Sequence, residues 1–337
     1  MKDEIKHIRV ILSPYFLQHI PNFRYFINKL ALIFRIIEMR VYFIIVLLIT
    51  INGLINGQTV KSFKTSDGET LYFTSLGTGP KVVLIPGGPG AGVSSLRMWA
   101  DSLSQDFECI LFDQRGTGLS SQAKLDSTTI NIQRATKDLD DLRKFLGEEK
   151  LILCGISWGG QLSLAYASYF PDNTRKIVPV CTWGPDTSYN KVIKETILMR
   201  RYQNERDSLD HWENQPDNDF SKAKRSLFIR IPYFYDHDKG YKLLPKMIAS
   251  REYYEEMSSL MFMDIRKNYN LTSYLRNYKN QCIVIRGRQD IVPAEAMYQL
   301  KEVVPQTKIY TIERCGHFPH YEQPHEFFRL LRKALQE

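Results

Sequence analysis

Short apolar runs alternate with segments of helical periodicity over most of the chain. The runs that predict buried strands lie at residues 81–85, 108–112, 151–154, 176–180, 281–285 and 308–312. Between them, residues 95–103 and 130–146 carry apolar side chains at helical spacing, and the second segment ends at Gly147, a residue type that often follows a helix. Strands that alternate with helices in this way predict an α/β fold, with a mostly parallel sheet covered by helices on both faces.

Two regions depart from this alternation. Residues 60–73 alternate apolar and polar positions around Asp67-Gly68, which predicts an antiparallel hairpin at one edge of the sheet. Residues 185–279 instead carry the helical patterns 192–209, 221–228 and 252–263. We therefore expect a helical cap at 185–279, inserted between a first core part at 58–184 and a second at 280–337.

One stretch near the start, residues 41–55, is apolar enough for a membrane. It is shorter than the roughly 20 residues that span a bilayer, and small and polar residues follow it. Residues 1–57 are therefore expected to be an N-terminal extension that ends in a secretory signal peptide, cleaved near Gly57, or in an uncleaved transmembrane anchor. Met39 would then be the true start. Both alternatives predict a protein exported to the periplasm or secreted, whose N-terminal segment engages the export machinery or the membrane.

Composition and charge limit the kinds of partner that the chain can bind. The chain is 43% hydrophobic and 24% charged, which suffices for a buried core. Its net charge is +8, but about half of that excess lies in residues 1–57, and no basic run is interleaved with aromatic residues. We therefore expect no nucleic-acid partner. The five cysteines are an odd number without close pairs, so neither a disulfide framework nor a metal site is predicted.

The residues that follow the strand-like run 151–154 have the pattern of a nucleophile elbow. They read Gly155-Ile156-Ser157-Trp158-Gly159, and a helical pattern comes next. In such an elbow the serine sits on a sharp turn between strand and helix, and the flanking glycines are needed because a Cβ atom would crowd the turn. Ser157 is therefore the predicted nucleophile.

A serine nucleophile needs a base, and the base needs an acid that orients it. Asp290 and His317 each lie five residues past a predicted strand, at the sheet edge where active residues gather. They also follow the chain order Ser, Asp, His that this elbow predicts. Asp186 remains an alternative acid and His320 an alternative base. The glycine before His317 suits a backbone held close to the elbow.

Acyl transfer also needs two N–H groups directed at the developing oxyanion. The amide of Trp158, directly after the nucleophile, is the first expected donor. The second is expected from the glycine-rich loop after residues 81–85, with Gly88 favoured over Gly87. No metal or organic cofactor is needed for this chemistry.

Several of these segments together resemble the α/β-hydrolase fold family, and within it the proline iminopeptidases. The matching residues are Gly87-Gly88-Pro89-Gly90, the octet DQRGTGLS at 113–120, the elbow, Gly287-Arg288-Gln289-Asp290 and Gly316-His317. The resemblance implies an α/β-hydrolase fold with an inserted cap and a Ser157, Asp290 and His317 triad. It also implies a pocket beneath the cap for the first residue of a small peptide, most often proline.

Two departures from the family bear on substrate choice. Pro86 stands where the family loop usually has histidine. The family also holds the substrate's ammonium group with cap carboxylates. Glu213 matches one of them, but Arg230, three residues before Tyr233-Phe234, stands where another is expected. An arginine there would repel an ammonium group and favour a carboxylate.

We therefore expect a serine hydrolase that resembles a prolyl aminopeptidase, with Glu213, Arg230 and Tyr233 at its substrate. The alternatives are an esterase or other small-acyl hydrolase, and a non-catalytic ligand-binding receptor on the same fold. The first two would act on a small peptide or a small ester.

Overall fold

The computed structural model describes residues 59–250 and 252–337. The chain divides into two compact units, residues 1–57 and 58–337, and the second contains every described residue. None of the helices in the described ranges has both the length and the apolar character needed to cross a bilayer. The structure therefore gives no support to the prediction of a signal peptide or transmembrane segment, and this prediction is withdrawn. Residues 41–55 and Met39, on which that expectation depended, lie outside the described ranges.

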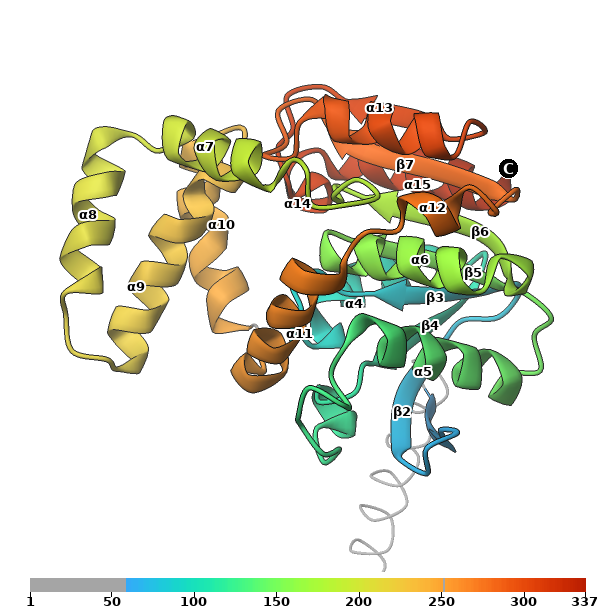
Figure 1. The fold of residues 1–337 in the computed structure, drawn as a ribbon. Helices are drawn as coiled ribbons and strands as arrows, with labels where there is room; N and C mark the ends of the chain where they lie inside the picture. The colour runs from blue at the N-terminus through green and yellow to red at the C-terminus, as the bar shows by residue number, and fades with distance from the viewer. Residues whose placement is uncertain (1–58, 251) are drawn as a thin grey trace, which may run out of the picture. The chain divides into compact units, whose positions relative to one another are not determined.

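The described unit is built on a sheet in the order β1-β2-β4-β3-β5-β6-β7-β8 (Figure 1). β1 and β2 form the predicted edge hairpin, and β2 also pairs antiparallel with β4, whereas all later pairs are parallel. This confirms the predicted mostly parallel sheet. The strands are β1 (Thr59–Lys64), β2 (Thr70–Leu76), β3 (Lys81–Ile85), β4 (Glu108–Asp113), β5 (Leu151–Ile156), β6 (Thr174–Val180), β7 (Gln281–Gly287) and β8 (Lys308–Ile312).

Helices cover both faces of the sheet, as the apolar pattern predicted. One face packs against α5 (Ile132–Phe145), α6 (Trp158–Tyr169) and α13 (Ala294–Val303). The other face packs against α4 (Arg97–Leu103) and α15 (Pro324–Gln336). The strands from β3 to β8 are parallel, so their carboxyl ends meet at one edge of the sheet, where the predicted chemistry lies.

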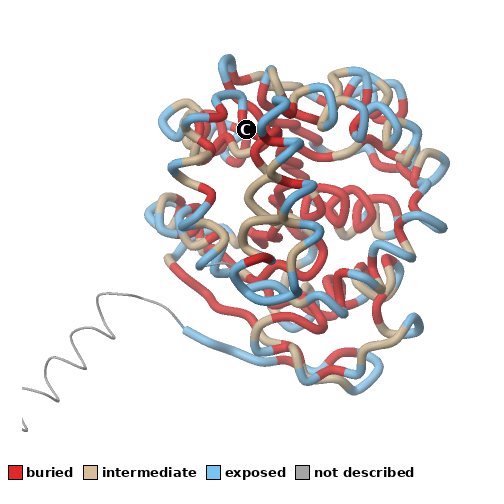
Figure 2. Tube along the Cα trace, turned by 90° about the vertical axis from the view of Figure 1, so that its left-hand side faces the viewer, coloured by how far each residue is buried: buried red, intermediate tan, exposed pale blue. Residues whose placement is uncertain are grey.

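The chain between β6 and β7 forms helices, which agrees with the pattern of residues 185–279, here called the cap. Figure 2 views the cap from its α8 side, where exposed and intermediate positions prevail over buried ones. The structure splits the predicted helical stretch 192–209, because the chain is extended at Arg201 and the Glu205 side chain accepts the Tyr202 N–H at 2.9 Å to start a new helix. The cap elements are α7 (Asn190–Arg200), α8 (Gln203–Glu213), α9 (Asp219–Arg230), the 3-10 turn η4 (Ile231–Tyr233), α10 (His237–Ala249), α11 (Glu255–Asn268) and α12 (Thr272–Leu275).

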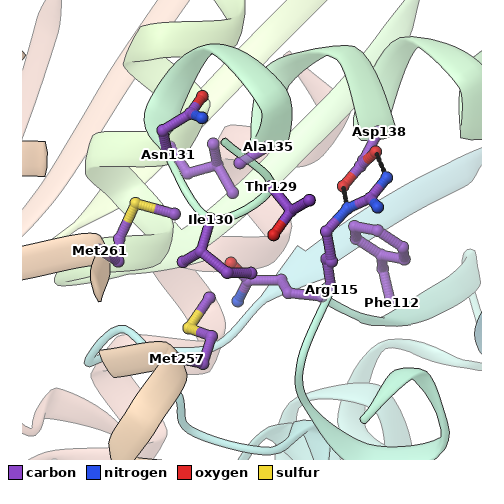
Figure 3. A pocket seen from close by; sticks show the side chains of 11 residues that line it. Phe112, Arg115, Thr129, Ile130, Asn131, Ala135, Asp138, Met257 and Met261 are labelled. Carbon is purple, nitrogen blue, oxygen red and sulfur yellow. Dashed lines mark hydrogen bonds and ion pairs between the residues drawn. The ribbon is translucent and has the colours of Figure 1, made fainter. Parts of the chain in front are cut away.

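α11 joins the cap to the core. Met257 and Met261 on this helix are buried against the α5 side of the sheet, and Figure 3 shows them facing Ile130 beside the start of α5. A gap of about 10 Å³ remains there, which holds at most one water. The same view shows the buried guanidinium of Arg115, which donates to both carboxylate oxygens of Asp138 at 2.9 and 2.8 Å. This region is therefore a packed, ion-paired joint and not a ligand site.

Candidate active site

Ser157 stands on the sharp turn between β5 and α6, with a backbone φ of 55° and ψ of −116°. Residues other than glycine rarely adopt a positive φ, so the turn is strained. The flanking glycines have a steric reason. A Cβ at Gly159 would lie 2.1 Å from the carbonyl oxygen of Ile85, and one at Gly155 would lie 2.3 Å from the carbonyl carbon of Gly159. The crowding expected from the sequence is confirmed.

Hydrogen bonds hold this turn against neighbouring elements. The Ser157 N–H donates to the carbonyl oxygen of Val180 at 2.8 Å, and the Thr182 hydroxyl donates to the Ser157 carbonyl at 2.9 Å. The indole N–H of Trp158 donates to the side chain of Gln114 at 3.0 Å, and both residues are buried. This last contact links the elbow to the segment after β4. The sequence does not indicate this contact, because only the fold brings residues 114 and 158 together.

The predicted acid and base are paired. Asp290 follows β7 and His317 follows β8, and His317 Nδ1 lies 2.7 Å from Asp290 Oδ1. The side chains are only 1% and 3% exposed. Because Nδ1 is engaged by the carboxylate, the imidazole is held in one orientation with Nε2 as its remaining nitrogen. The rings of Trp183 and Tyr233 stand edge-on to the imidazole, at 6.2 and 5.3 Å between ring centroids.

The two alternative residues have other contacts. The Asp186 carboxylate accepts hydrogen bonds from the Ser188 N–H at 2.9 Å and from Gln299 Nε2 at 2.9 Å, so it holds a loop together. His320 is buried against Trp99, and that burial lowers its pKa to about 3. His320 also lines the active-site cavity, but its ring stays neutral across the physiological range, and the Asp290 carboxylate pairs with His317. The geometry therefore favours Asp290 and His317.

Ser157 and His317 line one cavity of about 720 Å³ that lies between the core and the cap. The two predicted oxyanion loops reach the same cavity. Gly88 has a φ of 70°, which glycine adopts readily, and the Trp158 N–H is the first of helix α6, so it has no partner one turn earlier. Gly87 packs tightly as well: a Cβ there would lie 3.3 Å from that of Ser157.

The described side chains that carry a permanent charge in this cavity are all positive. Lys194, Arg230 and Arg266 line it, and among its described lining residues there is no aspartate or glutamate. Tyr233 also lines it, as predicted. Glu213 does not: it is exposed at the end of α8, whereas the cap side of the cavity comes from other helices. The predicted contact between Glu213 and substrate is therefore corrected.

The loop that carries His317 is held by the cap. The His317 N–H donates to the Tyr233 carbonyl at 2.7 Å, and a Cβ at Gly316 would lie 2.2 Å from that same oxygen. The glycine before the histidine thus allows close approach of the η4 turn of the cap. The expected approach to the elbow is corrected accordingly.

A buried carboxylate, Glu322, also connects the loop of His317 to the cap. One of its oxygens accepts the N–H groups of Gly316 at 2.9 Å and Phe318 at 3.3 Å, and the other accepts the Tyr235 N–H at 2.7 Å. It therefore bridges both neighbours of His317 to the cap. Burial raises the pKa of Glu322 to about 7 against the opposing effect of these hydrogen bonds. No sequence pattern indicates this role for Glu322, because Tyr235 comes from a distant segment of the chain.

Cys181 lies beside the acid and base. Its sulfur and the ligand atoms of Asp290 and His317 all lie within 4.8 Å of one another, which is close enough for a metal site. Burial raises the pKa of the Cys181 thiol well above its ordinary value, so the thiolate that metals prefer is disfavoured. The donor set therefore fits a hydrogen-bonded cluster around the Asp290 carboxylate better than a resident ion.

Comparisons with known proteins agree with this architecture. Residues 80–324 match the family model described as alpha/beta hydrolase fold. A proline iminopeptidase of Heyndrickxia coagulans is 23% identical over 276 residues, covering 78% of this chain and 93% of that protein. A 2-hydroxy-6-oxo-6-(2'-aminophenyl)hexa-2,4-dienoic acid hydrolase of Metapseudomonas resinovorans is 23% identical over 273 residues, covering 80% and 88%. A thermophilic esterase from Thermogutta terrifontis, solved with malate bound, superimposes with a TM-score of 0.61 at 23% identity, covering 82% and 98%.

Proposed function

The chain belongs to the α/β-hydrolase fold family, and from that premise we propose that it is a serine hydrolase that cleaves small acyl substrates through an acyl-enzyme. One observation carries the proposal. Ser157 on its strained turn and His317, paired at 2.7 Å with a buried Asp290, line the same cavity.

Each residue has a defined part in the reaction. His317 Nε2 takes the proton of the Ser157 hydroxyl as its oxygen attacks the substrate carbonyl, and the amides of Gly88 and Trp158 stabilise the oxyanion. The imidazolium then gives this proton to the leaving group, which departs and leaves the acyl-enzyme. His317 then takes a proton from water, whose oxygen attacks the acyl carbon; the acyl–Oγ bond breaks, the acid product leaves, and the imidazolium returns the proton to Ser157 Oγ. Asp290 holds the ring and stabilises its positive charge throughout.

Similarity and cavity charge favour different substrates. The similarity to a proline iminopeptidase favours a peptide with a free N-terminus. An ammonium group in this cavity, however, would face three cations and no described carboxylate, which is unfavourable. The related dienoic acid hydrolase is named for an acidic substrate. We therefore place the esterase or small-acyl hydrolase ahead of the aminopeptidase.

The test compares the full chain with its Ser157→Ala variant. A fluorophosphonate probe should label the wild type and leave the variant unlabelled, and the variant should lose about 10⁶-fold in kcat while its circular dichroism spectrum is unchanged. Proline β-naphthylamide, its N-blocked form and p-nitrophenyl butyrate should be assayed side by side. Absence of labelling, or turnover that survives in Ser157→Ala, would refute the mechanism. Faster cleavage of the free than of the blocked amide, with no ester cleavage, would restore the aminopeptidase.

A further inference from the structure

Arg230 differs from the other two cations of the active-site cavity. Lys194 on α7 and Arg266 on α11 are exposed, whereas Arg230 is half-buried at the end of α9. A cation held partly out of water loses hydration, and that loss is unfavourable unless an anion or other acceptors replace the water. Burial accordingly lowers the pKa of Arg230 from its ordinary value.

The protein supplies only part of what this guanidinium needs. Its Nη1 donates to the Ser226 carbonyl at 3.1 Å and to the Ser226 hydroxyl, one turn earlier in α9. No carboxylate within residues 59–250 and 252–337 pairs with it. Its neighbour Arg225 is different: it forms an ion pair with Asp217 and does not line the cavity.

Arg230 lines the same cavity as the proposed base and is linked to it through the next turn of the chain. The η4 turn follows it directly, and the Tyr233 ring in that turn lies 5.3 Å from the His317 ring. The cap residues around the cavity are otherwise largely apolar: Ile193, Ile197, Leu244, Met247, Ile248, Phe262 and Ile265. The cavity thus offers an apolar wall, a nucleophile and one half-buried cation.

We propose that Arg230 is an anion subsite, which binds a carboxylate or equivalent anionic group of the substrate. The favoured substrates are then acyl compounds with an apolar chain and one anionic end. This inference rests on the proposed function, because Ser157 must be the nucleophile that the bound substrate meets. The guanidinium offers parallel N–H groups that match the two oxygens of a carboxylate, which an ammonium ligand cannot use.

The experiment uses two matched probe pairs on the full chain. p-Nitrophenyl hydrogen glutarate against p-nitrophenyl valerate places the charge in the acyl part. 4-Butyryloxybenzoate against 4-butyryloxybenzamide places it in the leaving group. In at least one pair we expect kcat/KM for the anionic member to exceed that of the neutral member by about ten- to a hundredfold. The ratio should fall close to one in Arg230→Gln, remain in part in Arg230→Lys, and stay unchanged in the control Arg225→Gln.

The charge reversal Arg230→Glu gives a second readout. It should move the preference from the anionic esters to a cationic aminoacyl ester, such as alanine p-nitrophenyl ester. Circular dichroism checks that each variant is folded, and Arg230→Lys keeps the test decisive if the glutamate variant is not.

The possible outcomes distinguish a failure of the anion subsite from a failure of the proposed function. If fluorophosphonate labels the enzyme and neutral esters are cleaved, but neither anionic probe is preferred, the subsite is overturned and the proposed function stands. The same holds if the preference survives in Arg230→Gln, or disappears only in a Lys194→Gln, Arg266→Gln double variant. If the enzyme is neither labelled nor active on any ester, the proposed function itself fails.

Discussion

Glu322→Gln is the most informative single change, because it removes a buried charge while keeping the shape of the side chain. Glu322 is 4% exposed, and burial raises its pKa from 4.5 to about 7. An acid whose pKa is higher in the folded state keeps its proton up to a higher pH there than in the unfolded chain. Its contribution to stability is therefore most favourable below pH 4.5 and is lost as the pH rises towards 7.

The magnitude follows from the size of the shift. One pKa unit corresponds to about 1.4 kcal/mol, so a rise from 4.5 to about 7 amounts to about 3 kcal/mol in total. Between pH 5 and pH 8 about 2 to 3 kcal/mol of this is lost. Glutamine does not titrate. The free energy of unfolding of the wild type should therefore fall by that amount relative to Glu322→Gln over this interval.

Urea unfolding of the full chain at pH 5, 6, 7 and 8 measures the difference. Glu326→Gln is the matched control, because the Glu326 side chain is 44% exposed and paired with Arg329 at 2.7 Å, so its removal should shift all four values almost equally. A difference between wild type and Glu322→Gln that does not change with pH would refute the reasoning, since it would mean that this carboxylate does not titrate in the window.

The same variant should separate stability from activity. A carboxamide has only one acceptor oxygen, so it cannot accept N–H groups both from Gly316 and Phe318 and from Tyr235. On one side of the side chain, a backbone N–H would then face the carboxamide NH2 group, which is also a donor. Displacement of a catalytic group by a fraction of an ångström commonly reduces kcat by about ten- to a hundredfold. We expect this loss in Glu322→Gln at pH 5 as well as at pH 8, because it comes from the misplaced loop and not from titration of the carboxylate.

Two further substitutions, each with a matched control, test the site and the elbow. Asp290→Asn should reduce kcat by about 10⁴-fold, because the amide no longer holds the histidine ring as required, whereas Asp186→Asn should change kcat by less than about threefold; equal losses in steady-state assays would contradict the assignment of the acid. Gly159→Ala should leave little folded protein by circular dichroism and solubility, since its Cβ would lie 2.1 Å from a backbone oxygen. Gly147→Ala meets open space at a φ of 69° and should cost only about 1 kcal/mol; equal damage would refute the steric argument.

The sheet and the elbow were predictable because their signals are local. A five-residue apolar run predicts its own strand, and glycines two positions either side of Ser157 predict its turn. Asp290 and His317 were also within reach, since each follows a strand that ends at the same edge. For these parts of the chain, sequence spacing carries most of the three-dimensional information.

The remaining features depend on contacts between distant segments. Gln114 meets Trp158, and Cys181 meets Asp290, only because the sheet brings their strands together. Glu213 was placed at the substrate by its neighbour in sequence, but α8 turns it outward to solvent. A helical pattern indicates that a cap helix exists but not which of its faces meets the cavity, so residue assignments in the cap need coordinates.

The cap therefore does more than cover the cavity. One short segment at the end of α9 contains the cation proposed to bind substrate, Arg230, the carbonyl of Tyr233 that accepts the His317 N–H, and the N–H of Tyr235 that reaches Glu322. The cation and the backbone groups that hold the His317 loop thus lie within six consecutive residues. We therefore expect a substitution at Arg230 to alter kcat as well as KM, unlike one at the exposed Lys194.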